Sequence, residues 1–341
     1  MNKIEFDEKL DFTNVLIRPK RSTISSRSDV QLKRKFHFKY SPKTWENVPI
    51  MCANMDTVGT FGVYDCLHQY GMITTLHKFY NASDFEGKSL DPDLFMISTG
   101  ISDEDFHRLK SILEVVECHW ICIDVANGYM EKLVSFCQRV RTEFPDKIIV
   151  AGNVVTREVV EELILNGKVD VVKIGIGPGS ACTTRMKTGV GMPQLSAVLE
   201  CADAAHGVGG HIISDGGITC PGDMAKAFGG GADFVMVGGQ FAGHDQNPGE
   251  CITENGKQYK MFYGMSSDMA QKKHYGQMNH YRSSEGRVLK IPYRGDLAVT
   301  VQDFLGGLRS TCAYINAHSI KNMPKCTTFV RVTSQLNTVF V

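Results

Sequence analysis

The segment with the clearest chemical potential is GIGPGSACTTR, residues 175–185, in which a cysteine follows a run of glycines. The glycines and Pro178 predict a tight, exposed turn, whose N–H groups can point at an anion and whose carbonyls can point at a cation. Cys182 ends this turn, with Thr183 and Thr184 beside it. The spacing alone is equally consistent with a nucleophilic thiol and with an ordinary loop cysteine.

Two glycine pairs form a second candidate feature, in SDGG (214–217) and VGG (237–239). Backbone N–H groups at Gly216, Gly217, Gly238 and Gly239 are not screened by side chains, so they can bind phosphate. Asp215 precedes the first pair and is placed to accept hydrogen bonds from sugar hydroxyls. Tight turns without a ligand are the alternative, and we favour phosphate binding because two such pairs occur.

A third group of polar residues lies in FYGMSS (262–267) and YRSSEG (281–286). Met265 offers a flat apolar contact, and Ser266 and Ser267 offer hydrogen-bonding groups. Glu285 can serve as a general acid or base, although a solvated carboxylate is the commoner explanation of such a residue.

Eight apolar runs alternate with helical patterns and are expected to position these residues. The runs are 48–53, 72–77, 94–99, 119–125, 147–153, 169–175, 211–217 and 233–239. They are continuous rather than alternating, which is typical of parallel strands buried on both faces. An open doubly wound sheet is the competing fold, but no G-x-G-x-x-G follows the first run. We therefore predict a (β/α)8 TIM barrel, with the glycine turns at the carboxyl ends of its strands.

Two segments fall outside this repeat in what we expect to be a single domain over residues 1–341. Residues 1–46 are locally basic and are expected to form a solvated N-terminal arm. Residues 240–298 form a long insertion after the eighth strand, before a last helix expected near Val299. Because unstructured loops of this length are uncommon and usually functional, we predict a lid or flap over the site.

The overall composition limits which kinds of binding partner and which cellular compartment we expect. The chain has 37 basic and 37 acidic residues, which gives no electrostatic reason to expect nucleic acid or an anionic membrane. Its longest apolar runs fall far short of the roughly 20 residues of a membrane span. The N-terminus has no apolar signal sequence, and 11 cysteines in a large chain suggest reduced thiols. We expect a cytoplasmic protein without a cysteine metal site.

The order of motifs resembles the IMP dehydrogenase/GMP reductase family. The motifs are PIMCANMDTVG, DVANGY, AGNV, GIGPGSACTTR, KTGVG, PQLSAV, SDGGI, GADFVMVGG and YGMSS, which together span nearly the whole chain. Within the family the chain is similar to the reductase branch for two reasons. The second and third strands are separated by only about 15 residues, with no room for a regulatory domain. The insertion also has no Arg-Tyr pair resembling the one that activates water in the dehydrogenases.

The resemblance implies NADPH-dependent reductive deamination of GMP to IMP and ammonia through a covalent cysteine thioimidate, in purine salvage. Cys182 would attack the purine, and Thr184 and Glu285 would handle the proton that lets ammonia leave. The resemblance assigns GMP or IMP binding to Ser180, Asp215, Gly216, Gly217, Gly238, Gly239, Gly264, Met265, Ser266, Arg282, Ser283, Ser284 and Gly286.

The resemblance also implies where NADPH and a monovalent cation bind. It assigns the cofactor to Ser26, Arg27, Lys78, Asp124, Val125, Ala126, Ile176, Gly177, Tyr281, Ser310, Thr311, Cys312 and Ala313. It assigns a potassium ion to Gly177, Gly179, Cys182 and Arg185. Ser26, Arg27 and residues 310–313 would reach the cofactor across a subunit boundary, which implies a homo-oligomer, expected to be a tetramer.

Three other functions are compatible with parts of this pattern. A dehydrogenase without its regulatory domain would share the covalent step but oxidise IMP with NAD. A flavin-binding barrel could hold the FMN phosphate with the same glycine pairs, but would leave the cysteine turn unexplained. A non-catalytic nucleotide sensor would have no use for the combination of Cys182, Thr184 and Glu285.

Overall fold

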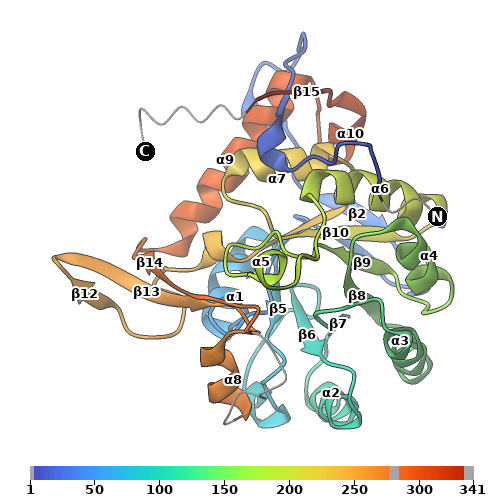
Figure 1. Cartoon of the computed structure of the whole chain (residues 1–341), viewed down its shortest axis with the longest axis vertical. Helices are drawn as coiled ribbons and strands as arrows, with labels where there is room; N and C mark the ends of the chain where they lie inside the picture. The colour runs from blue at the N-terminus through green and yellow to red at the C-terminus, as the bar shows by residue number, and fades with distance from the viewer. Residues whose placement is uncertain (1–3, 276–283, 334–341) are drawn as a thin grey trace.

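Eight parallel strands close into a barrel in the computed structural model, which describes residues 4–275 and 284–333 (Figure 1). The strands are β4 (Ile50–Cys52), β5 (Ile73–Leu76), β6 (Phe95–Thr99), β7 (Trp120–Asp124), β8 (Ile148–Val154), β9 (Val171–Ile174), β10 (His211–Asp215) and β11 (Phe234–Val237). Each lies within or one residue beyond one of the eight predicted runs, so the predicted (β/α)8 fold is confirmed.

Helices cover the outside of the barrel, as the repeat requires. They are α1 (Phe61–Leu67), α2 (Asp103–Val115), α3 (Glu131–Glu143), α4 (Arg157–Leu165), α6 (Gln194–Gly207), α7 (Pro221–Gly229) and α9 (Leu297–Ile315). The connection from β5 to β6 differs, because its helical structure is the short 3-10 turn η4 (Ala82–Phe85). The last helix begins at Leu297, two residues before the expected start.

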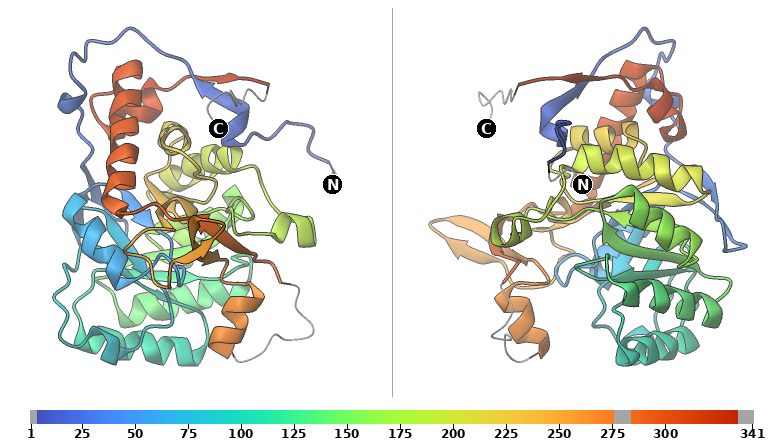
Figure 2. Two further views of the ribbon diagram at one scale, coloured as in Figure 1. Left: turned by 90° about the vertical axis from the view of Figure 1, so that its left-hand side faces the viewer. Right: turned by 45° about the vertical axis from the view of Figure 1, so that its right-hand side comes forward.

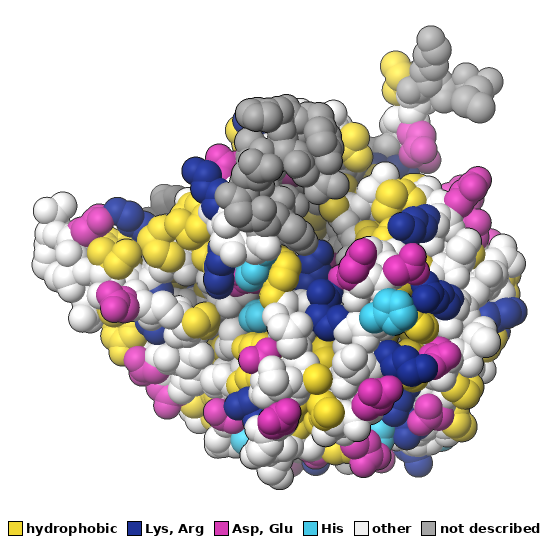
Figure 3. All heavy atoms as spheres, turned by 90° about the horizontal axis from the view of Figure 1, so that it is seen from below, with side chains coloured by type: hydrophobic (Ala, Val, Ile, Leu, Met, Phe, Trp, Pro, Cys, Tyr) yellow, Lys and Arg dark blue, Asp and Glu magenta, His cyan; other side chains and the backbone are white. Residues whose placement is uncertain are grey.

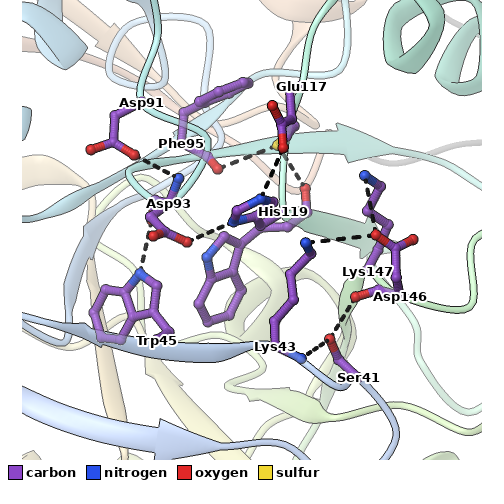
Figure 4. A network of polar contacts seen from close by, with 12 residues as sticks. Ser41, Lys43, Trp45, Asp91, Asp93, Phe95, Glu117, His119, Asp146 and Lys147 are labelled. Atoms are coloured by element: carbon purple, nitrogen blue, oxygen red, sulfur yellow. Dashed lines mark hydrogen bonds and ion pairs between the residues drawn. The ribbon is translucent and has the colours of Figure 1, made fainter.

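Residues 34–47 of the N-terminal segment close the amino end of the barrel, a role that the expected solvated arm did not include, whereas residues 18–29 are mostly exposed. Strands β2 (Arg34–His37) and β3 (Thr44–Asn47) pair antiparallel. Their basic and polar residues alternate with Phe36 and Trp45, which are only 2% and 1% exposed and pack on the barrel interior. The Trp45 indole also donates a hydrogen bond of 2.8 Å to the carbonyl of Asp93 (Figure 4).

The start of the chain continues along its C-terminal elements. Strand β1 (Val15–Ile17) pairs antiparallel with β15 (Phe329–Arg331), beyond the short helix α10 (Met323–Cys326). Figure 2 shows this blue segment running beside the red α9 and α10. The N–H of Lys20 donates to the carbonyl of Tyr314 at 2.9 Å, which fixes the segment to the end of α9.

The insertion after β11 is structured rather than an open loop. Its described part contains β12 (Ile252–Glu254), β13 (Lys257–Tyr263), α8 (Asp268–Tyr275) and β14 (Val288–Pro292). The three strands form an antiparallel sheet that projects from the side of the barrel (Figure 1). We call the part from Gly264 to Arg287 the flap. Its residues 276–283, with the predicted Tyr281, Arg282 and Ser283, lie outside the described residues.

Basic and acidic side chains are interspersed on the face that includes α8 and α2 (Figure 3). This mixture agrees with the balanced charge of the sequence. None of the helices in the described ranges is both long enough and apolar enough to cross a membrane.

Candidate active site

Cys182, Thr184 and Glu285 form a chain of hydrogen bonds at the carboxyl end of β9. The glycine turn after β9 leads into the short helix α5 (Thr184–Thr188), which brings Thr184 beside the cysteine. The Cys182 thiol donates to the Thr184 hydroxyl at 3.2 Å, and that hydroxyl donates to Oε2 of Glu285 at 2.7 Å. A thiol, a hydroxyl and a carboxylate in series can pass a proton from one end to the other.

Backbone contacts hold the flap against the cysteine turn. The N–H of Thr183 donates to the carbonyl of Glu285 at 2.8 Å, and Cys182 forms an antiparallel bridge with Gly286. A Cβ on Gly286 would lie 2.7 Å from the N atom of Ser267, so a larger residue would push the two flap segments apart. The position of Glu285 is therefore fixed by the backbone on both of its sides.

The half-buried Cys182 differs from most other cysteines in its surroundings. Cys52, Cys118 and Cys122 are buried among the barrel strands, and burial raises the pKa of each thiol to about 12. Such thiols stay protonated and unreactive at neutral pH. Cys182 lies instead on the loop that the flap covers.

The two glycine pairs converge on the same turn. A Cβ added to Gly216 would lie 2.8 Å from Cγ of Pro178, and one added to Gly239 would lie 2.8 Å from Oγ of Ser180. Gly216 and Gly217 also have φ values of +92° and +78°, which favour glycine. The structure thus brings together the loops after β9, β10 and β11, as a phosphate cradle requires.

Asp215, the predicted sugar-binding residue, is joined to the predicted cofactor residue Asp124 through Lys173. The Lys173 ammonium lies 2.7 Å from Oδ1 of Asp124 and 2.8 Å from Oδ2 of Asp215, and its side chain is only 4% exposed. Burial alone would lower the pKa of Lys173, but the two carboxylates outweigh it and raise the pKa above its ordinary value. Lys173 was not predicted as a site residue from the sequence. A lysine inside the apolar run 169–175 could have indicated a buried charge with acidic partners.

Asn153, at the end of β8, extends this group of polar residues. Its Nδ2 donates to the carbonyl of Gly175 and to Oδ2 of Asp215, both at 2.8 Å. Its Oδ1 is buried and has no hydrogen-bond partner within the described residues. A buried acceptor without a partner is costly, so this oxygen is suited to a ligand donor.

Asp56, which follows β4, binds side chains of α8 in the flap. It was also not predicted as a site residue from the sequence. Its fully buried carboxylate accepts hydrogen bonds from the Tyr263 hydroxyl at 3.1 Å, from the Lys273 ammonium at 3.2 Å and from the His274 ring. The Asp56 N–H contacts Sδ of Met265 at 3.3 Å, so the flap methionine is fixed to the same loop. Burial acts to raise the pKa of Asp56, but His274 and Lys273 lower it below its ordinary value.

The remaining predicted substrate residues of the flap lie near the cysteine turn. A Cβ on Gly264 would be 2.9 Å from the carbonyl of Ala181. Ser284 donates to the carbonyl of Gly286 at 3.0 Å, and its contact with the carbonyl of Ser266 is 3.5 Å long. The structure therefore gathers these residues around Cys182, whereas their contact with a purine stays a prediction.

The predicted cofactor residues fall into two groups in the chain. The first group follows the barrel strands β5, β7 and β9 and consists of Lys78, Asp124, Val125, Ala126, Ile176 and Gly177. The second consists of Ser26 and Arg27, at the turn η2 (Arg27–Asp29), and Ser310, Thr311, Cys312 and Ala313, on α9. η2 packs against α9. The Cys312 side chain is fully buried in the core, so it faces away from any surface ligand.

The residues predicted to bind a cation belong to one compact turn. The Cys182 N–H donates to the Gly179 carbonyl at 3.0 Å. A Cβ on Gly177 would lie 2.5 Å from Cγ of Arg185, whose guanidinium pairs with Asp11 at 3.2 Å. The turn offers backbone carbonyl oxygens, which are ligands that suit a monovalent cation.

A parallel barrel with the chain of Cys182, Thr184 and Glu285 and with glycine-rich loops at the carboxyl ends of its strands has the architecture of a nucleotide-binding TIM barrel. The family model described as "IMP dehydrogenase / GMP reductase domain" matches residues 94–337. The chain is 56% identical to "GMP reductase" of Caenorhabditis elegans, with 100% of this chain and 97% of the relative covered. It is 55% identical to "GMP reductase 2" of Homo sapiens, over 100% and 99% of the two chains. It is 56% identical to "GMP reductase" of Klebsiella pneumoniae, over 99% of each. The chain therefore belongs to the IMP dehydrogenase/GMP reductase family.

Proposed function

We propose that the chain is an oxidoreductase that converts GMP to IMP and ammonia with NADPH, in purine salvage. The observation that carries this proposal is the hydrogen-bonded chain from Cys182 through Thr184 to Glu285. The glycine cradle beside this chain and the full-length similarity to proteins named GMP reductase support it.

In the proposed reaction Cys182 attacks C2 of the purine and forms a covalent adduct. The amine at C2 leaves poorly unless it is protonated, so a proton must reach it. Thr184 and Glu285 relay that proton, because the threonine hydroxyl already bridges the thiol and the carboxylate. Departure of ammonia leaves the thioimidate, and the flap positions Glu285 for this step through the Thr183 and Gly286 contacts.

Asp124 and Asn153 are suited to hold the nicotinamide cofactor. Asp124 is linked to Lys173, and Oδ1 of Asn153, which has no hydrogen-bond partner in the described part of the chain, lies in the same polar group beside Asp215. NADPH, when bound, would supply the hydride that reduces C2, and the Cys182 thiolate would then leave C2 as IMP forms. We place it along the carboxyl ends of β5, β7 and β9, next to the cysteine turn.

The assembly and the cation form a second part of the proposal. Ser26, Arg27 and residues 310–313 lie on η2 and α9 rather than on the barrel's strand ends, so a partner subunit would have to present them. We propose a cytoplasmic homotetramer with a shared cofactor pocket. Potassium would be held by carbonyls of Gly177, Gly179 and Cys182, in the turn that Arg185 braces.

Mixing the protein with GMP and NADPH and following the nicotinamide absorbance tests the proposal. We expect a steady decrease that depends on both compounds. A yellow purified protein with a bound flavin, or no decrease at any protein concentration, would argue for one of the other barrel functions.

A further inference from the structure

A cluster of metal-binding side chains lies at the amino end of the barrel, opposite the cysteine turn. His206 is near the end of α6, His211 is the first residue of β10, and Asp233 directly precedes β11. One ligand atom from each lies within 4.8 Å of the other two. Two imidazoles and a carboxylate are a ligand set that zinc uses in proteins.

The ring of His211 is oriented so that one nitrogen faces the carboxylate without a hydrogen bond. Its Nε2 lies 3.0 Å from the carbonyl of His37, so Nε2 carries the proton in the neutral ring. Its Nδ1 is buried, without a hydrogen-bond partner within the described residues, and lies 3.5 Å from Oδ2 of Asp233. The Nδ1 atom and the carboxylate oxygen can face each other at this distance only with a proton or a metal ion between them.

The distances between the ligand atoms of the cluster suit an ion with tetrahedral coordination. Zinc bonds of about 2.0–2.1 Å place neighbouring ligand atoms about 3.3 Å apart, close to the 3.5 Å between His211 and Asp233. The His206 Nε2 lies 2.7 Å from the same oxygen, as a hydrogen bond. Because the His206 side chain is 44% exposed, it can move by the small amount that metal binding requires.

Neighbouring groups also hold the side chains of the cluster in position. The His37 carbonyl fixes the ring of His211, which is the usual support of a ligating histidine. Arg34 pairs with the other carboxylate oxygen, Oδ1, at 2.7 Å, whereas Oδ2 faces the histidines and also accepts a hydrogen bond from the Ile212 N–H at 3.0 Å. The guanidinium reduces the attraction of this carboxylate for hard cations such as Mg²⁺, whereas two nitrogen ligands favour zinc.

We propose that His206, His211 and Asp233 bind one Zn²⁺ ion, with a water molecule as the fourth ligand on the exposed side of His206. The ion would join α6, β10 and the start of β11 to β2, through Arg34 and His37. It would fasten the N-terminal hairpin onto the barrel without taking part in chemistry at Cys182.

The proposal can be tested with full-length protein freed of metal by a chelator and titrated with CoCl2 or ZnCl2 alone. We expect one equivalent of Co²⁺ to give the visible bands of a four-coordinate site, without the charge-transfer band of thiolate ligands. His206→Ala should weaken binding at least about tenfold, and His211→Ala should do the same. His107→Ala, which removes an exposed histidine on α2, is the matched control and should bind as the wild type does.

Thermal unfolding provides a second measurement. Zinc at about 100-fold above the wild-type Kd should raise Tm of the wild type by about 4 °C and Tm of His206→Ala by no more than about 2 °C. Equal cobalt binding by the wild type and His206→Ala would overturn the proposal, as would thiolate ligation of the first equivalent. All three variants should retain GMP turnover without metal, so failure of the zinc site is distinguishable from failure of the proposed reaction.

Discussion

Replacing Glu285 with glutamine tests the proposed proton relay most selectively. The side chain keeps its shape and can still accept the 2.7 Å hydrogen bond from Thr184, but it can no longer hold a proton for the departing amine. General acid–base catalysis is worth a factor of about 10²–10⁴, or about 3–5 kcal/mol in the activation barrier. We expect GMP turnover to fall by that factor.

The rate of hydride transfer between the cofactor and C2 should change little in this variant, because no amine leaves in that step. Transfer of deuterium from deuterated NADPH to C2 of IMP, in the presence of NADP, measures this step alone. It should change by no more than about fivefold in Glu285→Gln, since the loss of a charged acceptor at one hydrogen bond costs only about 1 kcal/mol. Glu250→Gln, at an exposed position in the same insertion, is the control. Equal loss of turnover and deuterium transfer would mean that Glu285 holds the flap rather than moving a proton.

Three further substitutions follow from the site. Cys182→Ala should abolish turnover while GMP still binds, and GMP should protect the wild-type thiol from alkylation. Lys173→Met should lower the free energy of unfolding by about 3–5 kcal/mol in urea, because it leaves the Asp124 and Asp215 carboxylates without their shared cation. Asp56→Asn should speed protease cleavage within the flap and raise KM for GMP, since its carboxylate anchors α8.

Each of these variants has a matched control, in which the same substitution is made at an exposed position outside the site. Cys220→Ala removes an exposed thiol, Lys132→Met removes an exposed ammonium on α3, and Asp65→Asn removes an exposed carboxylate on α1. These three proteins should behave as the wild type does. Residual turnover in Cys182→Ala, or the same stability in Lys173→Met as in Lys132→Met, would contradict the account.

The barrel and the grouping of its loops were predictable because they depend on local patterns. Buried parallel strands need continuous apolar runs, and the carboxyl ends of such strands meet at one edge, so the loops with Cys182, Asp215 and Gly238 had to converge. The glycine pairs lie beside the cysteine turn, as this reasoning predicted, whereas phosphate binding by them stays a prediction. The pairing of Thr184 with Glu285 was expected only from the family resemblance.

The parts that depend on partners distant in sequence were not predictable in this way. Phe36 and Trp45 sit among lysines, arginines and other polar residues in two short strands, so their burial is visible only when the barrel end is present to receive them. The Lys173 ammonium is stable in the interior because Asp124, on β7, and Asp215, on β10, both reach it. Asp56 likewise acquires its role only when the flap folds over it.

Product analysis by chromatography tests the central claim most directly. With GMP and NADPH, the account predicts IMP, ammonia and NADP in equal amounts. With IMP and NAD, it predicts no appreciable xanthosine monophosphate, because the sequence of the insertion has no Arg-Tyr pair resembling the one that activates water in the dehydrogenases. Steady accumulation of xanthosine monophosphate would contradict the proposed reaction and place the chain in the dehydrogenase branch of its family.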